Sequence, residues 1–287
     1  MERAGLNGIE IAYRVDGDRS PTRPWLVFAH ALGHDHSMWD AQAEAFGRAC
    51  NILRYDLRGH GASEAPRGDY TLEQMAEDLR ALLDHLSVRR CHFVGLSLGA
   101  MVGQLAAIRT PLRFVSLTLA GAACRFSPQM QPVWAGRIAA VRSPLGMDAI
   151  IDATISGWFT AAFFAGRPAD LTRAVQVLRR TPMHGYIGAI AAMSRADLTA
   201  RLAAVGCPVL VIAGDGSGRL VLAGEGPIRL IVRGDDMGST QASNAASIRC
   251  FREGVMRDVE VMAVGPWFPE AARLLREDPG LDVGLHL

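Results

Sequence analysis

The sequence predicts an α/β fold in which a mostly parallel sheet is covered by a helical cap. Short apolar runs of strand length alternate with amphipathic helical segments along the first 120 residues, and this alternation is typical of a sheet with helices on both faces. Residues 121–205 interrupt the alternation with a series of helical segments. The apolar run 208–213 then returns to the pattern of a buried strand.

Composition favours a folded protein that acts on small molecules. The chain has 287 residues, of which 49% are hydrophobic and 21% are charged, and its net charge is +1. This balance is typical of a domain with a sizeable core, and it predicts neither a nucleic acid nor a membrane as partner. The five cysteines lack metal-site spacing, the N-terminus lacks the apolar core of a signal peptide, and no apolar run is long enough to cross a membrane. We therefore expect reduced thiols and a cytoplasmic location.

The first part of the chain contains the strands and helices of the expected sheet. Segment 8–15 alternates apolar and polar residues, whereas 25–29 is continuously apolar, as a strand buried on both faces would be. Thr71 can cap the amphipathic helix 72–86, whose apolar positions recur at intervals of three and four. The other elements expected here are a helix over 39–50 and strands over 51–55, 91–94 and 114–120.

Residues 90–111 combine a strand, a tight turn and a helix around Ser97. The turn reads Gly95-Leu-Ser-Leu-Gly99, and the helix is expected to stop before Thr110 because a proline follows. This combination is the context of a nucleophile elbow, in which the two glycines let strand and helix cross closely. We predict that Ser97 is the catalytic nucleophile. The alternative is a glycine-rich turn with an ordinary serine.

Two backbone N–H groups are expected to form an oxyanion hole beside Ser97. In a hydrolase with a nucleophile elbow, one donor belongs to the residue after the nucleophile, and the other belongs to a loop after an early central strand. We assign these donors to Leu98 and to Leu32, which lies in the loop His30-Ala-Leu-Gly-His34. The alternative for this loop is a plain strand-to-helix turn.

Residues 121–205 are interpreted as a cap that walls the substrate pocket. They carry several large aromatic side chains, each of which could instead be an ordinary core residue. These aromatic residues are Trp134, Trp158, Phe159, Phe163 and Phe164. Helices are expected over 134–141, 147–156, 169–181, 185–193 and 198–205.

Residues 8–214 resemble the 3-oxoadipate enol-lactonases, which are α/β-hydrolases. The matching segments are Phe28-Ala-His-Ala-Leu-Gly33, Ser37-Met-Trp-Asp40, Arg54-Tyr-Asp-Leu-Arg-Gly-His-Gly-Ala-Ser63, Gly95-Leu-Ser-Leu-Gly-Ala-Met-Val-Gly103, Trp158-Phe-Thr160, His184-Gly-Tyr186 and Cys207-Pro-Val-Leu-Val-Ile-Ala-Gly214. The resemblance implies a small lactone or ester as substrate and no cofactor. It also implies that Ser97 attacks the ring carbonyl while a histidine, oriented by an aspartate, takes the serine proton.

The resemblance ends before the acid and the base of this mechanism. Ser217 stands where the family has its aspartate, and Asp215, two residues earlier, is the substitute that we consider. The histidines after Ser97 are His184 in the cap and His286, and neither lies in the family's Gly-His motif. Because serine is a poor nucleophile without an adjacent base, we predict a serine hydrolase with impaired activity.

From about residue 227 the chain resembles the start of the YdjC-type carbohydrate deacetylases. The matches are Leu230-Ile-Val-Arg-Gly-Asp-Asp-Met-Gly238, Glu253-Gly-Val-Met256 and Asp278-Pro-Gly-Leu-Asp-Val-Gly-Leu-His-Leu287. The resemblance implies a divalent metal, with Asp235 as base and Asp236 and His286 as metal ligands. Two ligands leave a catalytic metal one short of the usual three. The alternative is that Asp235 and Asp236 form a strand-end turn.

Three parts are therefore expected: a hydrolase part (1–216) without its C-terminal end, a linker or fusion seam (217–226) and a deacetylase-like fragment (227–287). In the last part, strands are expected over 228–232, 259–264 and 281–287, and helices over 243–254 and 269–277. Because an open sheet edge is a liability, we expect strand 228–232 to dock beside 209–213. Three functions remain open. The chain could be a lactonase-type hydrolase or a metal-dependent deacetylase fragment. It could also be an inactive fusion product from a recombined or mis-assembled reading frame.

Overall fold

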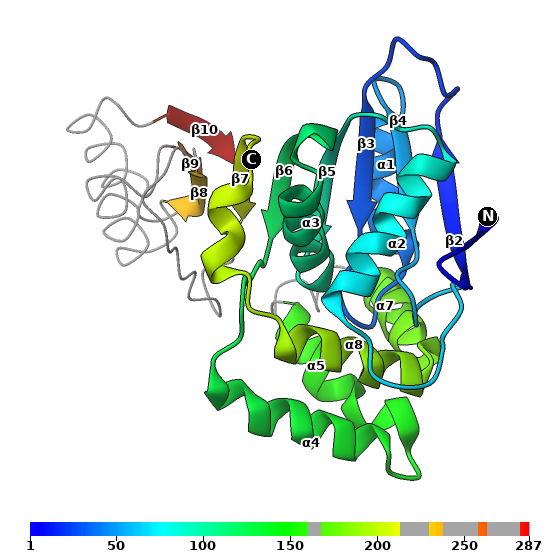
Figure 1. Cartoon of the computed structure of the whole chain (residues 1–287). Coiled ribbons are helices and arrows are strands. Elements are labelled where there is room, and N and C mark those ends of the chain that lie inside the picture. The colour runs from blue at the N-terminus through cyan, green and yellow to red at the C-terminus, as the bar shows by residue number, and fades with distance from the viewer. Residues whose placement is uncertain (160–167, 213–229, 238–257, 263–281, 287) are drawn as a thin grey trace.

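The computed structural model describes residues 1–159, 168–212, 230–237, 258–262 and 282–286. These residues form one ten-stranded sheet in the order β1-β2-β4-β3-β5-β6-β7-β8-β9-β10 (Figure 1). The strands are β1 (Glu2–Leu6), β2 (Ile9–Asp16), β3 (Trp25–Ala29), β4 (Asn51–Tyr55), β5 (Cys91–Leu96), β6 (Phe114–Ala120), β7 (Val209–Ile212), β8 (Leu230–Met237), β9 (Asp258–Met262) and β10 (Asp282–His286). The pairs β1–β2 and β2–β4 are antiparallel, and all the other pairs are parallel.

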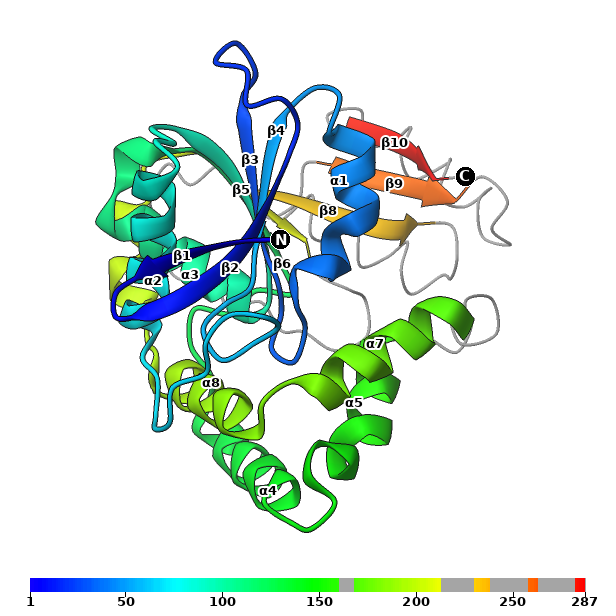
Figure 2. The same cartoon turned by 90° about the vertical axis from the view of Figure 1, so that its right-hand side faces the viewer.

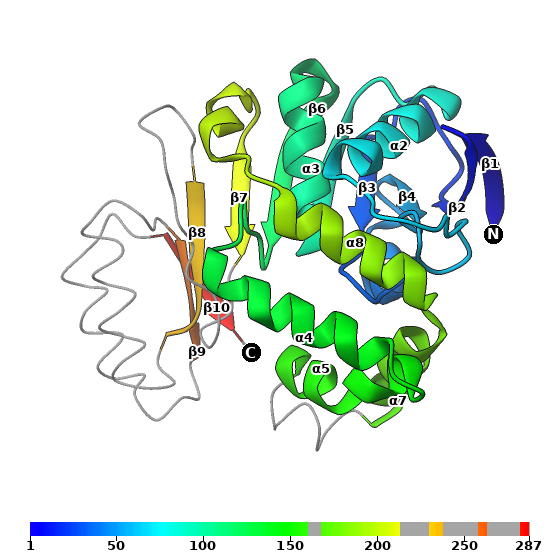
Figure 3. The ribbon, with the colours of Figure 1, turned by 60° about the horizontal axis from the view of Figure 1, so that its bottom comes forward.

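Helices cover both faces of this sheet, and further helices form a cap at one end of it. The helix α1 lies on one face, and α2 and α3 lie on the other (Figure 2). In the cap, α8 lies between the sheet and α4 (Figure 3). The helices are α1 (Asp40–Phe46), α2 (Leu72–His85), α3 (Leu98–Arg109), α4 (Gln131–Val141), α5 (Ile151–Trp158), α7 (Pro168–Arg180) and α8 (Met183–Arg195). The predicted α/β fold with a helical cap is thus confirmed.

Most predicted elements appear within a few residues of their expected bounds, and the exceptions have local causes. The strand β1 was not predicted, because its exposed polar residues hide the apolar alternation of a sheet edge. The helix expected over 39–50 is divided into a 3₁₀ turn, His36–Trp39, and the shorter α1. The helix expected over 198–205 is a 3₁₀ segment, Thr199–Ala204. The helices expected over 243–254 and 269–277 and the linker 217–226 lie outside the described residues.

The helix α2 shows how local sequence and core packing agree. Thr71 accepts a hydrogen bond from the Gln74 N–H, and the Gln74 side chain accepts one from the Thr71 N–H, which forms the predicted cap as a capping box. Met75, Leu79 and Leu82 of this helix are completely buried against the sheet. This apolar burial holds α2 against the sheet.

The strand β8 pairs with β7 in parallel, with Val209 opposite Leu230 and Ile212 opposite Arg233. The prediction that the segment beginning at 228 docks beside 209–213 is confirmed, with the strand running from Leu230 to Met237. All parallel strands have their carboxyl ends at one edge of the sheet, so the turn after β5 and the ends of β8 and β10 face the same edge (Figure 1).

Candidate active site

Ser97 lies at a strained turn between β5 and α3. Its φ is +51° and its ψ is −109°, a backbone conformation that residues other than glycine rarely adopt. The turn is held because the Ser97 N–H donates to the Ala120 carbonyl at 2.9 Å and the Ser97 carbonyl accepts from the Met101 N–H at 3.0 Å. The Ser97 side chain is half-buried, and its hydroxyl makes no hydrogen bond to any residue in the described part of the chain.

The glycines around Ser97 are required by close backbone contacts. A Cβ on Gly95 would lie 2.6 Å from the Gly99 carbonyl carbon, and a Cβ on Gly99 would lie 2.3 Å from the Ala29 oxygen. A Cβ on Gly103 would meet the Phe93 ring at 2.1 Å. These separations confirm that strand and helix cross as closely as the sequence predicted. They also place the start of α3 directly beside the end of β3.

The loop after β3 begins beside the start of α3, because a Cβ on Gly99 would lie 2.8 Å from the His30 carbonyl oxygen. The His34 N–H donates to the Ala31 carbonyl at 3.1 Å, and Gly33 has a φ of +74°, so the segment 31–34 is a tight turn. The Leu32 N–H has no hydrogen-bond acceptor among the described residues. The Leu98 N–H lies in the first turn of α3, where N–H groups have no acceptor within the helix. Leu98 therefore has a free N–H next to Ser97, and Leu32 has a free N–H in the loop after β3.

Cap helices cover this loop. A Cβ on Gly33 would lie 2.7 Å from a Leu178 methyl group and 3.6 Å from Trp158. The imidazole of His34 stacks on the Trp158 ring with a centroid distance of 4.2 Å, and burial lowers the His34 pKa to about 4. The cap therefore rests on the loop that carries Leu32.

No imidazole in the described part of the chain is hydrogen-bonded to Ser97. Burial keeps the pKa of His60 at about 3, and its Nδ1 lies 3.1 Å from the Arg58 carbonyl. The other histidines that hydrogen-bond elsewhere are His30 with Ala31 and Leu57, His36 with Asp56, His85 with Tyr13, His92 with Ser116, and His184 with Ala65. The interpretation of the histidines before Ser97 as structural or solvated residues agrees with these contacts.

A buried carboxylate–imidazole pair stands near the loop and was missed in the sequence. The Asp56 carboxylate accepts hydrogen bonds from His36 Nδ1 at 2.8 Å, from the His36 N–H at 2.7 Å and from the Ala62 N–H at 2.8 Å. Burial alone would lower the His36 pKa, but the hydrogen bond and charge of Asp56 outweigh it and raise that pKa. The two residues are 20 positions apart, and no motif signals such a pairing.

This pair predicts a pH-dependent contribution to stability. The pKa of His36 is higher in the folded than in the unfolded chain. The pair therefore contributes its full stabilisation below the unfolded pKa of about 6.5. This stabilisation is lost as the pH rises through the folded pKa. We expect His36→Gln to cost about 1–2 kcal/mol at pH 6 and less at pH 9, measured by urea unfolding. The control, His92→Gln, removes an imidazole bonded to the Ser116 hydroxyl. A His36→Gln cost that grows with pH would contradict this account.

Of the residues predicted to act as acid, base or metal ligands, Asp235, Asp236 and His286 lie in described strands. Asp215 lies outside the described residues. Asp235 and Asp236 belong to β8 at a register shift between Gly234 and Met237, a bulge that breaks the pairing with β9. His286 ends β10, which is separated from β8 by β9. The described residues contain no group of three or more metal-binding side chains, and the metal site at Asp236 and His286 stays a prediction.

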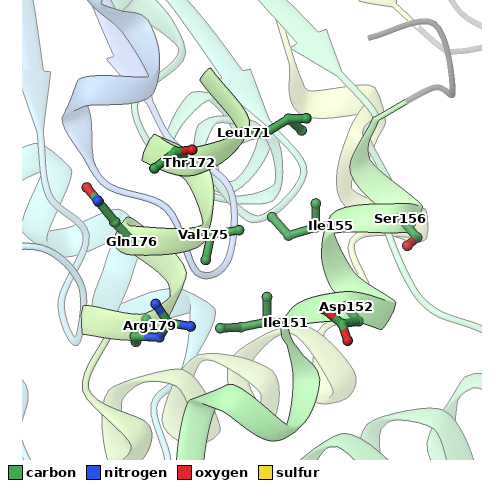
Figure 4. A pocket seen from close by; sticks show the side chains of 9 residues that line it. All are labelled: Ile151, Asp152, Ile155, Ser156, Leu171, Thr172, Val175, Gln176 and Arg179. Carbon is green, nitrogen blue, oxygen red and sulfur yellow. The ribbon is translucent and has the colours of Figure 1, made fainter. Parts of the chain in front are cut away.

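The cap contains a separate cavity of about 440 Å³ between α5 and α7 (Figure 4). Ile151 and Ile155 of α5 face Leu171 and Val175 of α7 across it. Neither Ser97 nor the two predicted oxyanion donors line this cavity. It is therefore distinct from the site around the β5–α3 turn.

Within the described ranges, no helix has both the length and the apolar character needed to cross a membrane.

Comparisons with known proteins agree with the observed fold. The model of the alpha/beta hydrolase fold matches residues 24–219, and the model of YdjC-like protein matches residues 229–287. The 3-oxoadipate enol-lactonase 2 of Acinetobacter baylyi is 35% identical over 192 residues, which are 67% of this chain and 71% of that protein.

Two solved structures extend the comparison to three dimensions. A hydrolase from Pseudomonas aeruginosa PA01 is 41% identical to this chain, with a TM-score of 0.69. The match covers 74% of this chain and 79% of that hydrolase. The enol-lactonase from Burkholderia xenovorans LB400 is 32% identical to this chain, with a TM-score of 0.72. The match covers 97% of this chain and 96% of that enol-lactonase. The chain therefore belongs to the α/β-hydrolase family.

Proposed function

We propose that the chain is a serine hydrolase of the 3-oxoadipate enol-lactonase type that cleaves a small lactone or ester through Ser97. The observation that carries this proposal is the strained Ser97 turn, with φ +51° and a hydroxyl free of hydrogen bonds among the described residues. Leu32 and Leu98 supply the two N–H donors that stabilise the oxyanion, each contributing a few kcal/mol in a water-excluded site. This part of the reaction needs no cofactor, and its partners are small molecules rather than nucleic acids or membranes.

We further propose that turnover is impaired because the general base is missing. Among the described residues up to 212, every histidine hydrogen-bonds or stacks elsewhere, and Ser217 stands where the family has its aspartate. With an oxyanion hole but without a base, the enzyme acylates slowly and hydrolyses its acyl-serine more slowly still. Asp215 remains the substitute acid in this proposal. A cytoplasmic location fits the four free cysteines found in the described part of the chain.

The proposal is tested with p-nitrophenyl acetate and simple γ-lactones, followed by intact-mass measurement. We expect a burst of p-nitrophenol, an accumulating acyl adduct and slow turnover, all insensitive to a chelator. Rapid turnover without an accumulating adduct would contradict impairment, and turnover abolished by the chelator would favour metal chemistry instead.

Arg137 of α4 supports an anionic substrate. Its Nη1 donates to the Tyr186 hydroxyl at 3.1 Å, and the Tyr186 ring lies 3.5 Å from where a Cβ of Gly33 would be. Burial raises the Tyr186 pKa, so this phenol stays protonated. Among the arginines of residues 1–159 and 168–212, Arg137 alone is at least partly buried without a carboxylate partner. An acidic group on the substrate would complete its hydrogen bonds.

We expect Arg137→Gln to raise KM for an ester that carries a free carboxylate by roughly 10- to 100-fold, the value of a charge-assisted hydrogen bond. KM for the matched neutral ester should change little. Steady-state kinetics with both esters make the measurement, and Arg142→Gln, an exposed arginine at the end of the same helix, is the control. An equal change for both esters would show that Arg137 does not recognise charge.

A second candidate function, a metal-dependent carbohydrate deacetylase fragment, is favoured by the YdjC-like match to residues 229–287. In this proposal Asp235 is the base, and Asp236 and His286 hold a divalent metal. The parts 1–216, 217–226 and 227–287 would then derive from two proteins, with an inactive fusion product as the remaining alternative. Zinc binding by isothermal titration, lost in Asp236→Ala, would support this candidate, and no binding by the folded chain would exclude it.

A further inference from the structure

The His30 imidazole sits directly beneath the loop that carries Leu32, and its tautomer follows from its two hydrogen bonds. His30 Nε2 accepts from the Leu57 N–H at 2.9 Å, so this nitrogen carries no proton. His30 is completely buried, and burial lowers its pKa, so the ring is neutral. The proton of a neutral ring with a free Nε2 is on Nδ1, and Nδ1 lies 2.8 Å from the Ala31 carbonyl oxygen. His30 therefore donates from Nδ1 to Ala31.

This hydrogen bond determines which way the Leu32 N–H points. The Ala31 carbonyl and the Leu32 N–H belong to one trans peptide, so they point in opposite directions. Because the carbonyl is directed at the buried His30 ring, the N–H of Leu32 is directed away from it. The Ala31 carbonyl also accepts from the His34 N–H at 3.1 Å, which closes the turn.

The loop could adopt a second arrangement if the imidazole donor were lost. Rotation of the Ala31–Leu32 peptide would reverse the directions of its C=O and N–H groups. The Ala31 carbonyl would then point where the Leu32 N–H now points. A carbonyl oxygen in that place would repel an oxyanion instead of stabilising it. The His30 ring itself is confined, since the His60 ring lies 5.2 Å away, centroid to centroid, on another loop.

We propose that His30 is a positioning residue for the hydrolytic reaction: its Nδ1–H holds the Ala31 carbonyl and so aims the Leu32 N–H at the oxyanion formed on Ser97. The inference rests on the function proposed above. His30 takes no part in proton transfer, because both of its nitrogens are engaged with backbone groups.

Two substitutions separate positioning from simple packing. The amide of His30→Asn places an N–H donor near the position of Nδ1, whereas His30→Gln places its amide near the position of Nε2 and leaves the Ala31 carbonyl without this donor. The rate constant for phosphonylation of Ser97 by a fluorophosphonate is measured for the wild type and both variants, with urea unfolding as a check of stability. We expect His30→Asn to react within about threefold of the wild type and His30→Gln to react at least about tenfold more slowly.

The outcomes discriminate clearly. Equal rates for the two variants, or a faster His30→Gln, would overturn the positioning role. Wild-type protein that is folded but unlabelled would instead contradict the proposed function. In that case nitrogen NMR of the His30 ring still tests the geometry, because a proton found on Nε2 would overturn the inference and a proton on Nδ1 would support it.

Discussion

Replacing Ser97 by alanine should abolish the burst of product release and lower ester hydrolysis by roughly 100-fold or more, to the background rate of the buffer. The structural reason is that Ser97 lies at the strained β5–α3 turn with its hydroxyl free of hydrogen bonds among the described residues, directly before the free N–H of Leu98. Without the hydroxyl no acyl-enzyme can form, although the oxyanion donors remain. The measurement is the pre-steady-state release of p-nitrophenol.

The control for this experiment is Ser156→Ala, which removes an exposed hydroxyl from α5 at the cap cavity. It should leave both burst and turnover unchanged. Because the Ser97 side chain accepts no hydrogen bond from described residues, Ser97→Ala should also unfold at nearly the wild-type urea concentration. A burst that persists in folded Ser97→Ala would place the nucleophile elsewhere.

The second large effect concerns stability, and it arises from a buried ion pair between the β4–α2 loop and α2. Arg58 Nε and Nη2 donate to the Asp78 carboxylate at 2.6 and 2.7 Å, and both side chains are buried. Asp78 also accepts from Asn7 Nδ2 at 3.0 Å. Arg58→Ala leaves the Asp78 charge buried without its partner, so we expect a loss of about 3–5 kcal/mol in the free energy of unfolding.

The helix α2 offers a matched control for this loss. Arg80→Ala removes a half-exposed arginine that pairs with Glu77 and Asp84 on the same helix, and exposed pairs contribute about 0.2–1 kcal/mol. Urea unfolding at pH 7 measures both variants. The double replacement Arg58→Met with Asp78→Leu should recover much of the loss, because it removes both charges together. A loss in Arg58→Ala as small as that in Arg80→Ala would contradict the burial of this pair.

Much of the fold was predictable from particular segments. The strands 25–29, 51–55 and 114–120 were predicted to the residue, because each is a mostly apolar segment of strand length bounded by loop residues. The docking of β8 beside β7 was predictable because a parallel sheet with an open edge lacks hydrogen-bond partners. The edge strand β1 was not predicted, because most of its side chains are exposed and show no apolar alternation.

The surroundings of the site were harder to predict, because they depend on pairs of residues far apart in the chain. The Ser97 turn has a local motif, whereas the Asp56–His36 pair and the Arg137–Tyr186 contact join different elements and leave no spacing to detect. The role of His30 depends on a backbone carbonyl, which the sequence does not single out. The predicted Asp215 lies outside the described residues, so its place in the mechanism stays a prediction.

The central claim is that Ser97 is a nucleophile held at a strained turn beside two oxyanion donors and without a histidine base. Incubation with a fluorophosphonate, followed by peptide mapping, tests it most directly. We predict a phosphonyl adduct on the peptide that contains Ser97, formed slowly and absent from Ser97→Ala. A folded protein with no adduct at Ser97 would contradict the claim.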